Sequence, residues 1–271
     1  MHKLIWITDP HLVEAGREWP AGVDPLLRLR LCLDEIRKHH ADADRIVVSG
    51  DLIQIRNLAA YDILRRELDA MGTPYRLIAG NHDDRKALAA AFPNVPRHDG
   101  FIQYAEEMPG ANLLFLDSVT RDGKHHGELC ASRLGWIDER IAAADHRPLL
   151  IFLHHPPCDI GVPALDRLKL LDAAPLAQLL RRRRAPTFLL CGHLHRNVSG
   201  IWAGHPFASL KSTHVQYDLD MVASKLVRST EPPGYGVIIV RGDDVVMNYR
   251  DVAVAETVGA ETWPPRATLQ R

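Results

Sequence analysis

Cysteine is scarce in this sequence, which has four among 271 residues. Cys32, Cys130, Cys158 and Cys191 lie far apart and form no CxxC pair. A disulfide framework or a zinc ribbon needs paired or closely spaced cysteines. We therefore expect reduced thiols that are mostly buried.

Long apolar runs and an excess of one charge are also missing. No apolar run approaches the roughly 20 residues of a membrane span, and the N-terminus lacks the apolar region and cleavage site of a signal peptide. We expect a cytoplasmic protein without a membrane partner. The formal net charge of −1 gives no overall attraction to a nucleic-acid polymer, so partners must be recognised locally.

The sequence contains no internal repeat and no Pro- or Ser-rich linker, and its 46% hydrophobic content supports one large core. Short apolar runs at 4–8, 46–49, 75–79, 113–116, 149–153 and 187–191 alternate with amphipathic stretches at 25–40, 58–71, 85–92, 132–144 and 167–184. This alternation predicts an α/β fold.

The last third of the chain has a different pattern. After Asn197, short strand-like pieces at 198–202, 206–210, 236–240 and 245–249 are separated by glycine and proline. We expect these pieces to form a second, more antiparallel sheet that packs on the first. The architecture would be a two-sheet sandwich flanked by helices, built as one domain over residues 1–271.

Groups that can bind metals follow five of the predicted strands. Taken alone, Gly80-Asn81-His82-Asp83 is a weak signal, because Asn and His are common in turns. The same position after other strands is occupied by Asp9 and His11, by Asp51, by His154 and His155, and by His193 and His195. Open α/β sheets bind ligands at the carboxyl ends of their strands, so these segments are expected to converge on one edge.

The residue types indicate which ions this edge would bind. Two carboxylates, one amide and several imidazoles form a mixed oxygen and nitrogen set without thiolate, which suits Mn, Fe, Zn or Co ions. Seven ligands are too many for one tetrahedral ion, and they fit two ions about 3.5 to 4 Å apart. Two divalent ions against two carboxylates leave the site cationic, which favours a phosphoryl group as the substrate.

These segments resemble the five motifs of calcineurin-like metallophosphoesterases in order and spacing, over residues 4 to about 200. The motifs are Asp9-Pro10-His11, Gly50-Asp51, Gly80-Asn81-His82-Asp83, His154-His155-Pro156-Pro157 and Gly192-His193-Leu194-His195. Further similarities at 116–118, 126–129, 134–137 and 232–235 resemble the bacterial branch that holds class III cyclic nucleotide phosphodiesterases and glycerophosphodiesterases.

The resemblance implies a four-layer αββα sandwich of the metallo-dependent phosphatase type, with two mixed sheets, and a role for each motif residue. Asp9, His11 and His195 would hold the first metal; Asn81, His154 and His193 the second. Asp51 would bridge them. His82 would contact the phosphate and protonate the leaving alkoxide, while metal-bound hydroxide attacks. Asn81, His82 and His214 would face the substrate.

The implied function is a dinuclear metal-dependent phosphodiesterase acting on cyclic nucleotides such as cAMP or on glycerophosphodiesters. Phosphomonoester and phosphonate-ester hydrolysis are alternatives within the same chemistry. A non-catalytic binding scaffold is disfavoured by the complete ligand set, and a nuclease by the neutral charge. Relatives are often oligomers built through C-terminal elements, so we expect a homo-oligomer with residues 203–235 as a cap or oligomerisation segment.

Several histidines and acids near the motifs have simpler interpretations. If its strand continues, His155 faces away from His154, which favours a packing or supporting role. Asp83 and Asp84 are expected to cap the helix that begins at Arg85, although Asp83 could also orient His82. His214 is equally compatible with packing and with a substrate pocket. Seven other histidines, at 2, 39, 40, 98, 125, 146 and 205, are expected at the surface or in the core.

Overall fold

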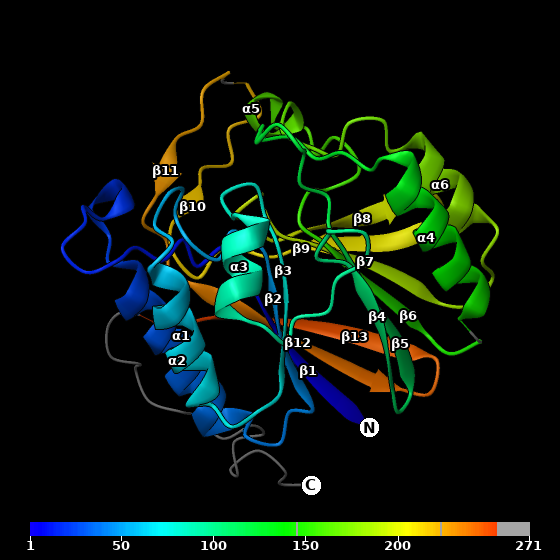
Figure 1. Ribbon diagram of the computed structural model, residues 1–271, viewed down its shortest axis with the longest axis horizontal. Helices are drawn as coiled ribbons and strands as arrows, with labels where there is room; N and C mark the ends of the chain where they lie inside the picture. The colour runs from blue at the N-terminus through cyan, green and yellow to red at the C-terminus, as the bar shows by residue number, and fades with distance from the viewer. Residues whose placement is uncertain (145, 223, 254–271) are drawn as a thin grey trace, which may run out of the picture.

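Two β-sheets packed face to face form the centre of the molecule, and helices cover their outer faces (Figure 1). The computed structural model describes residues 1–144, 146–222 and 224–253. The first sheet has the order β13-β12-β1-β2-β3. Its strands are β1 (His2–Ile7), β2 (Arg45–Ser49), β3 (Tyr75–Ile78), β12 (Gly234–Arg241) and β13 (Asp244–Asp251). The predicted four-layer αββα sandwich is confirmed.

The second sheet has the order β4-β5-β6-β7-β9-β8. It consists of β4 (Tyr104–Met108), β5 (Ala111–Leu116), β6 (Leu149–Leu153), β7 (Thr187–Cys191), β8 (Val198–Trp202) and β9 (His205–Ser209). A small separate ladder joins β10 (Gln216–Tyr217) to β11 (Arg228–Ser229). The sequence pattern does not predict β4, because its two central glutamates, Glu106 and Glu107, hide the alternation of an edge strand.

The prediction that the C-terminal third forms the second sheet is wrong. Strands β12 and β13 join the first sheet through antiparallel pairing of β1 with β12, and only β8 and β9 extend the second. Pairing partners depend on tertiary contacts that a local pattern does not contain. The five motif-bearing strands are therefore divided between the sheets, with β1, β2 and β3 in one and β6 and β7 in the other.

The helices lie close to the predicted positions. They are α1 (Pro25–His39), α2 (Ala60–Asp69), α3 (Arg85–Ala91), α4 (Ala131–Ala143), α5 (Pro163–Asp166), α6 (Ala174–Arg181) and a 3-10 turn, η1 (Pro20–Gly22). The helix expected over 167–184 is shorter, because Pro175 fits only the first turn and α6 begins there. In the described parts of the chain, no helix combines the length and apolar character that crossing a membrane requires.

Aromatic side chains fill the space between the sheets. Phe115 stacks on Tyr104 with ring centroids 4.5 Å apart and on Phe152 at 5.3 Å, and the edge of Trp6 faces Phe152 at 6.4 Å. The Trp6 indole donates a hydrogen bond to Ser49 Oγ at 2.8 Å. These contacts hold β1, β2, β5 and β6 in fixed relation, which also fixes the loops at their carboxyl ends.

A buried polar cluster at the end of β5 fixes the following loop. Arg133 of α4 is fully buried, and its Nη1 donates to the carbonyl oxygens of Asp117 and Val119, both at 2.9 Å. Arg85 of α3 makes two hydrogen bonds to the Asp117 carboxylate, at 2.7 and 2.8 Å. Both guanidinium groups lie over the ring of Phe101. The cluster joins two helices from different sides of the sandwich to one strand end.

Replacing Arg133 with methionine should destabilise the protein by about 3 kcal/mol, because the buried Asp117 carbonyl oxygen loses its donor and Val119 O keeps only the hydrogen bond from Arg85. Chemical denaturation of the variant measures the loss. Arg140→Met on the same helix, where the side chain is exposed, is the control and should change stability by less than about 0.5 kcal/mol. Equal effects of the two substitutions would contradict a structural role for the buried guanidinium.

Candidate metal centre

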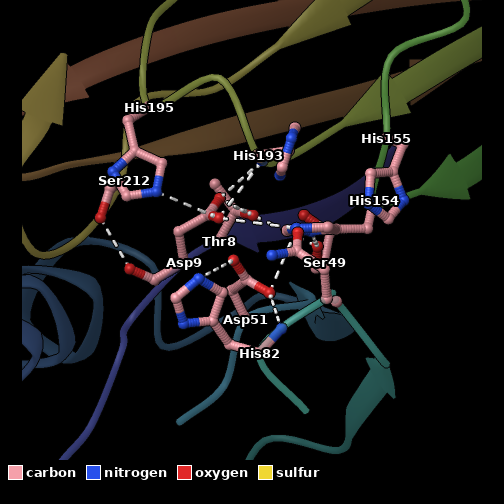
Figure 2. A network of polar contacts seen from close by, with 12 residues as sticks. Thr8, Asp9, Ser49, Asp51, His82, His154, His155, His193, His195 and Ser212 are labelled. Carbon is pink, nitrogen blue, oxygen red and sulfur yellow. Dashed lines mark hydrogen bonds and ion pairs between the residues drawn. The ribbon is translucent and has the colours of Figure 1, made fainter. Parts of the chain in front are cut away.

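The loops after β1 and β2 carry Asp9, His11 and Asp51 and remain hydrogen-bonded to each other beyond the strands. Asp9 N donates to Gly50 O at 3.1 Å, and His11 N donates to Asp51 O at 3.0 Å. Figure 2 shows the side chains that gather around Asp9 and Asp51, with His82 below and His154, His193 and His195 above or beside them. The strand pairing therefore continues into the site and sets its geometry.

Five residues in the loops after β1, β2 and β7 have a positive φ, which is uncommon outside glycine. They are Asp9 (52°), His11 (45°), Asp51 (49°), His193 (70°) and His195 (49°). Such conformations cost roughly 1–3 kcal/mol each and persist where the surrounding structure fixes them, commonly at functional sites. Backbone strain is thus present at five of the residues whose side chains converge.

Two glycines allow this close convergence. A Cβ at Gly80 would lie 2.2 Å from Asp51 Oδ1 and 2.8 Å from His154 Nε2. A Cβ at Gly192 would lie 2.3 Å from Thr8 Oγ1 and 2.9 Å from Asp9 Oδ2. Because atoms cannot approach so closely, any residue with a Cβ at these two positions would clash, and the third and fifth motifs therefore require glycine there.

Asp9 lies at the centre of a first group of side chains. Its Oδ1 is 3.3 Å from His195 Nε2 and 3.9 Å from His11 Nε2, and those two imidazole nitrogens are 3.1 Å apart. Ligand atoms of the three residues all lie within 4.8 Å of one another. Two nitrogens and a carboxylate oxygen at this separation can share one ion.

Asp51 lies between this group and a second one. Its Oδ2 is 3.6 Å from His11 Nε2, while its Oδ1 is 3.3 Å from His154 Nε2. Oδ1 also accepts a hydrogen bond from the backbone N of His82 at 2.8 Å. The carboxylate therefore faces both groups, as a bridging ligand must.

The second group contains buried polar atoms without hydrogen-bond partners. Among the described residues, these atoms include Asn81 Oδ1, His154 Nε2, His155 Nε2 and His193 Nε2. Leaving such atoms unpaired costs free energy, and an ion is a common explanation. The outer nitrogen of His154 faces the carbonyl oxygen of Ser49 at 2.9 Å, which is the usual support for a metal-binding histidine. The residues fit a metal ion.

The electrostatics of the pocket favour positive charge. Burial opposes ionisation of Asp9, but the charges of His195 and His154 lower its pKa to about 2. Burial lowers the pKa of His154, yet Asp51 and Asp9 raise it to about 9. Burial and the neighbouring His154 lower the pKa of His193 to about 3. Two carboxylates thus attract cationic charge, while the His193 imidazole, with its lowered pKa, stays neutral and can act as a ligand.

His82 lies at the open side of the site and contacts Gln54, a residue that the motifs do not include. Its Nδ1 is 2.8 Å from Gln54 Oε1, and its Nε2 is 3.9 Å from Asp51 Oδ2. Burial lowers the pKa of His82, while Asp51 opposes this shift. The sequence gives no signal for Gln54 beyond its position three residues after Asp51.

His125 is an exposed histidine, as expected, and it also lies against the site. Its Nδ1 is 2.9 Å from Asn81 Nδ2, and its ring lies 5.7 Å from that of His82. The residue is on the exposed loop after β5, next to the 126–129 segment that resembles the bacterial branch. A loop residue far from the strand ends has no periodic signal, so the sequence does not indicate its position beside Asn81 and His82.

His155 also points into the centre, and the prediction that it faces away is wrong. Strand β6 ends at Leu153, so alternation no longer applies two residues later. The His155 ring lies 4.7 Å from that of His193, and its Nδ1 is 2.8 Å from Ser118 Oγ. It therefore supports or extends the second group.

Asp84 caps α3 as predicted, because its side chain accepts from Ala87 N at 2.9 Å. Asp83 neither caps the helix nor touches His82. Its Oδ2 accepts from Gly80 N at 2.8 Å and from Leu52 N at 3.1 Å, and its Oδ1 accepts from Tyr61 at 3.0 Å. Burial, with Asp51 adding to it, raises the pKa of Asp83 to about 7. This carboxyl group ties together the loops that carry Asp51 and Asn81.

His214 lies beside the first group rather than within it. Its ring is 6.3 Å from that of His11, its Nε2 is 2.9 Å from Val23 O, and its own carbonyl oxygen accepts from Arg28 at 2.6 Å. The side chain is buried. Packing and a place at the edge of a substrate pocket are both compatible with these contacts.

The buried His214 predicts a pH dependence of stability. Burial lowers its pKa from 6.5 to about 4. Between these two pKa values His214 is protonated in the unfolded chain and neutral in the folded protein. The free energy of unfolding therefore falls as the pH decreases from 6.5 to about 4. Denaturant unfolding at pH 7 and pH 4 should show up to about 3 kcal/mol less acid destabilisation for His214→Gln than for the wild type. Equal losses of unfolding free energy in the variant and the wild type would contradict the lowered pKa of His214.

Known proteins are similar to this chain in sequence and in fold. The family model described as calcineurin-like phosphoesterase matches residues 2–197. A probable cyclic nucleotide phosphodiesterase of Rhodopseudomonas palustris is 37% identical over 250 residues, covering 91% of each chain. The 3′,5′-cyclic adenosine monophosphate phosphodiesterase CpdA of Escherichia coli is 31% identical, covering 89% of this chain and 86% of that one.

A solved structure has the same fold at lower sequence identity. The crystal structure of a dimetal phosphatase from Danio rerio superposes with a TM-score of 0.69 at 16% identity, covering 93% of this chain and 96% of that one. The family model spans most of the chain, and two relatives above 30% identity extend over nearly all of it. This protein therefore belongs to the calcineurin-like phosphoesterase family.

Proposed function

We propose that this protein is a dinuclear metal-dependent phosphodiesterase that hydrolyses small phosphodiesters, with cyclic nucleotides as the first substrate class and glycerophosphodiesters as the second. The observation that carries this proposal is the position of Asp51 between two groups of buried ligand atoms. Two relatives that align over most of their length are named as cyclic nucleotide phosphodiesterases, which supports a cyclic nucleotide as the substrate.

Seven side chains would hold the two ions. Asp9, His11 and His195 surround the first position, Asn81, His154 and His193 the second, and Asp51 faces both. The donor set of oxygen and nitrogen suits Fe, Mn, Zn or Co. When bound, such ions supply a hydroxide nucleophile at neutral pH and neutralise charge on the phosphoryl oxygens.

His82 is the proton donor in this proposal. Hydrolysis breaks the bond between phosphorus and the leaving oxygen, and the departing alkoxide takes a proton that His82 Nε2 delivers. The ring edge is at the open side, with 18% of the side chain exposed, so it can reach a substrate oxygen. Asn81 and His214 complete the proposed substrate contacts, and His125 joins them because its ring lies beside both Asn81 and His82.

Other expectations from the sequence stay predictions. They are one domain over residues 1–271, of which 254–271 lie outside the described part; a cytoplasmic location; and a homo-oligomer in which residues 203–235 serve as a cap or interface. Light scattering of the purified protein tests the oligomer.

The enzyme proposal is tested with protein stripped of metal by a chelator and then supplied with Mn²⁺. We expect about two ions per chain by elemental analysis, and hydrolysis of cAMP and bis(p-nitrophenyl) phosphate that depends on the added ion. A non-catalytic scaffold would leave both esters intact with metal present. A preference for p-nitrophenyl phosphate over the diesters would instead identify a phosphomonoesterase.

Removing the proposed proton donor should affect substrates unequally. His82→Ala should keep its metal content and lose about 10²- to 10⁴-fold in kcat for cAMP, whose alkoxide needs a proton. The loss for bis(p-nitrophenyl) phosphate should be much smaller, because nitrophenolate leaves unprotonated. His39→Ala, on the exposed side of α1, is the control. Equal losses for both esters would show that His82 binds phosphate without delivering a proton.

A further inference from the structure

The side chain of Gln54 joins a proposed metal ligand to the proposed proton donor. Its Oε1 is 3.2 Å from His11 Nδ1 and 2.8 Å from His82 Nδ1. The two rings meet edge to face, with centroids 4.6 Å apart and an interplanar angle of 81°. We propose that Gln54 is a positioning residue that fixes both imidazoles through one oxygen atom. This inference rests on the function proposed above.

The backbone holds Gln54 beside His11. After β1 and β2 end, Leu12 N donates to Leu52 O at 3.2 Å and Gln54 N donates to Leu12 O at 2.8 Å. Leu12 and Ile53 form an isolated parallel bridge. This pairing continues the β1–β2 ladder past Asp9 and Asp51. The backbone of Gln54 is therefore fixed close to the two carboxylates, and its side chain extends from there.

An amide oxygen can only accept hydrogen bonds, which determines the tautomer of both rings. Each imidazole must present Nδ1–H to Gln54. This leaves His11 Nε2 unprotonated, as a metal ligand requires, while His82 delivers a proton from Nε2 only when its ring carries a second proton there. His11 Nε2 is 3.6 Å and His82 Nε2 is 3.9 Å from the same atom, Asp51 Oδ2. Gln54 therefore contacts both rings on one side, and both rings direct Nε2 toward the same carboxylate on the other.

A glutamine suits this position better than an acid. Asp9 and Asp51 already bring two negative charges into the site, and a third carboxylate would offset much of the cationic field that a phosphodiester needs. The neutral amide orients the rings without that charge. Supports of this kind behind metal-binding histidines typically change metal affinity or activity by about 10- to 100-fold.

The test compares Gln54→Leu, which removes the acceptor at similar volume, with Gln54→Glu, which keeps an acceptor. Gln178→Leu on the exposed face of α6 is the matched control. For Gln54→Leu we expect kcat for cAMP to fall about 10- to 100-fold with KM nearly unchanged, and a smaller fall for bis(p-nitrophenyl) phosphate. Gln54→Glu should recover part of the cAMP rate.

A double variant separates positioning from general damage. If Gln54 acts on the reaction through His82, adding Gln54→Leu to His82→Ala should lower kcat for cAMP little further. Titration with Co²⁺, followed by visible absorption, should show weakened binding of one of two ions in Gln54→Leu, because His11 loses its support. That readout needs no catalysis.

Two results would overturn the proposal. One is a Gln54→Leu variant with wild-type kcat and Co²⁺ binding. The other is a loss of rate that is equal for both esters and multiplies with His82→Ala, which would indicate a structural defect. An inactive wild type with bound metal would refute the proposed function instead, while the Co²⁺ titration would still decide whether Gln54 supports His11.

Discussion

The arrangement of this protein depends on two buried carboxylates, Asp9 and Asp51, that the fold brings together at one end of the sandwich. Both are almost completely removed from solvent. Buried negative charge is costly unless it is compensated, and here the compensation comes from cationic charge held among surrounding imidazoles. The raised pKa of His154 and the lowered pKa of Asp9 are two expressions of this same attraction. A site with this electrostatic character favours metal ions, and through them a phosphoryl group.

Holding the carboxylates in place requires elements that have no contact with a substrate. The pairing of β1 with β2 continues through the loops, and five residues adopt left-handed conformations that the loop hydrogen bonds maintain. Asp83, which is buried and bonded to Gly80, Leu52 and Tyr61, joins the second loop to the third. The stacked rings between the sheets fix the distance between the motifs on the first sheet and those on the second. The positions of the side chains at the site therefore depend on packing throughout the sandwich.

Around the ligand atoms lies a layer of supporting side chains and backbone groups. Ser49 O faces His154, Val215 O faces His195, Ser118 Oγ faces His155, and Gln54 Oε1 faces both His11 and His82. In each case an oxygen lies at one ring nitrogen and the other nitrogen is directed at the centre. This repeated pattern sets the tautomer and direction of each imidazole before any ion or substrate arrives. The Gln54 contact differs from the others because it links a ligand to the group that would move a proton.

The sequence by itself determined the elements and the ligand chemistry. Apolar runs, their carboxyl-terminal Asp, Asn and His residues, and the glycines of the motifs are local features. In the structure Asp9, His11, Asp51, His154, His193 and His195 lie close together, and Asn81 Oδ1 is buried without a hydrogen-bond partner. Only the tertiary structure decided which strands belong to which sheet, that His155 turns inward after β6 ends, and that His125, Asp83 and Gln54 lie beside the motif residues. The reason is physical: strand partners and loop directions depend on contacts between residues distant in sequence, and a histidine or glutamine in a loop carries no periodic signal of what it will face.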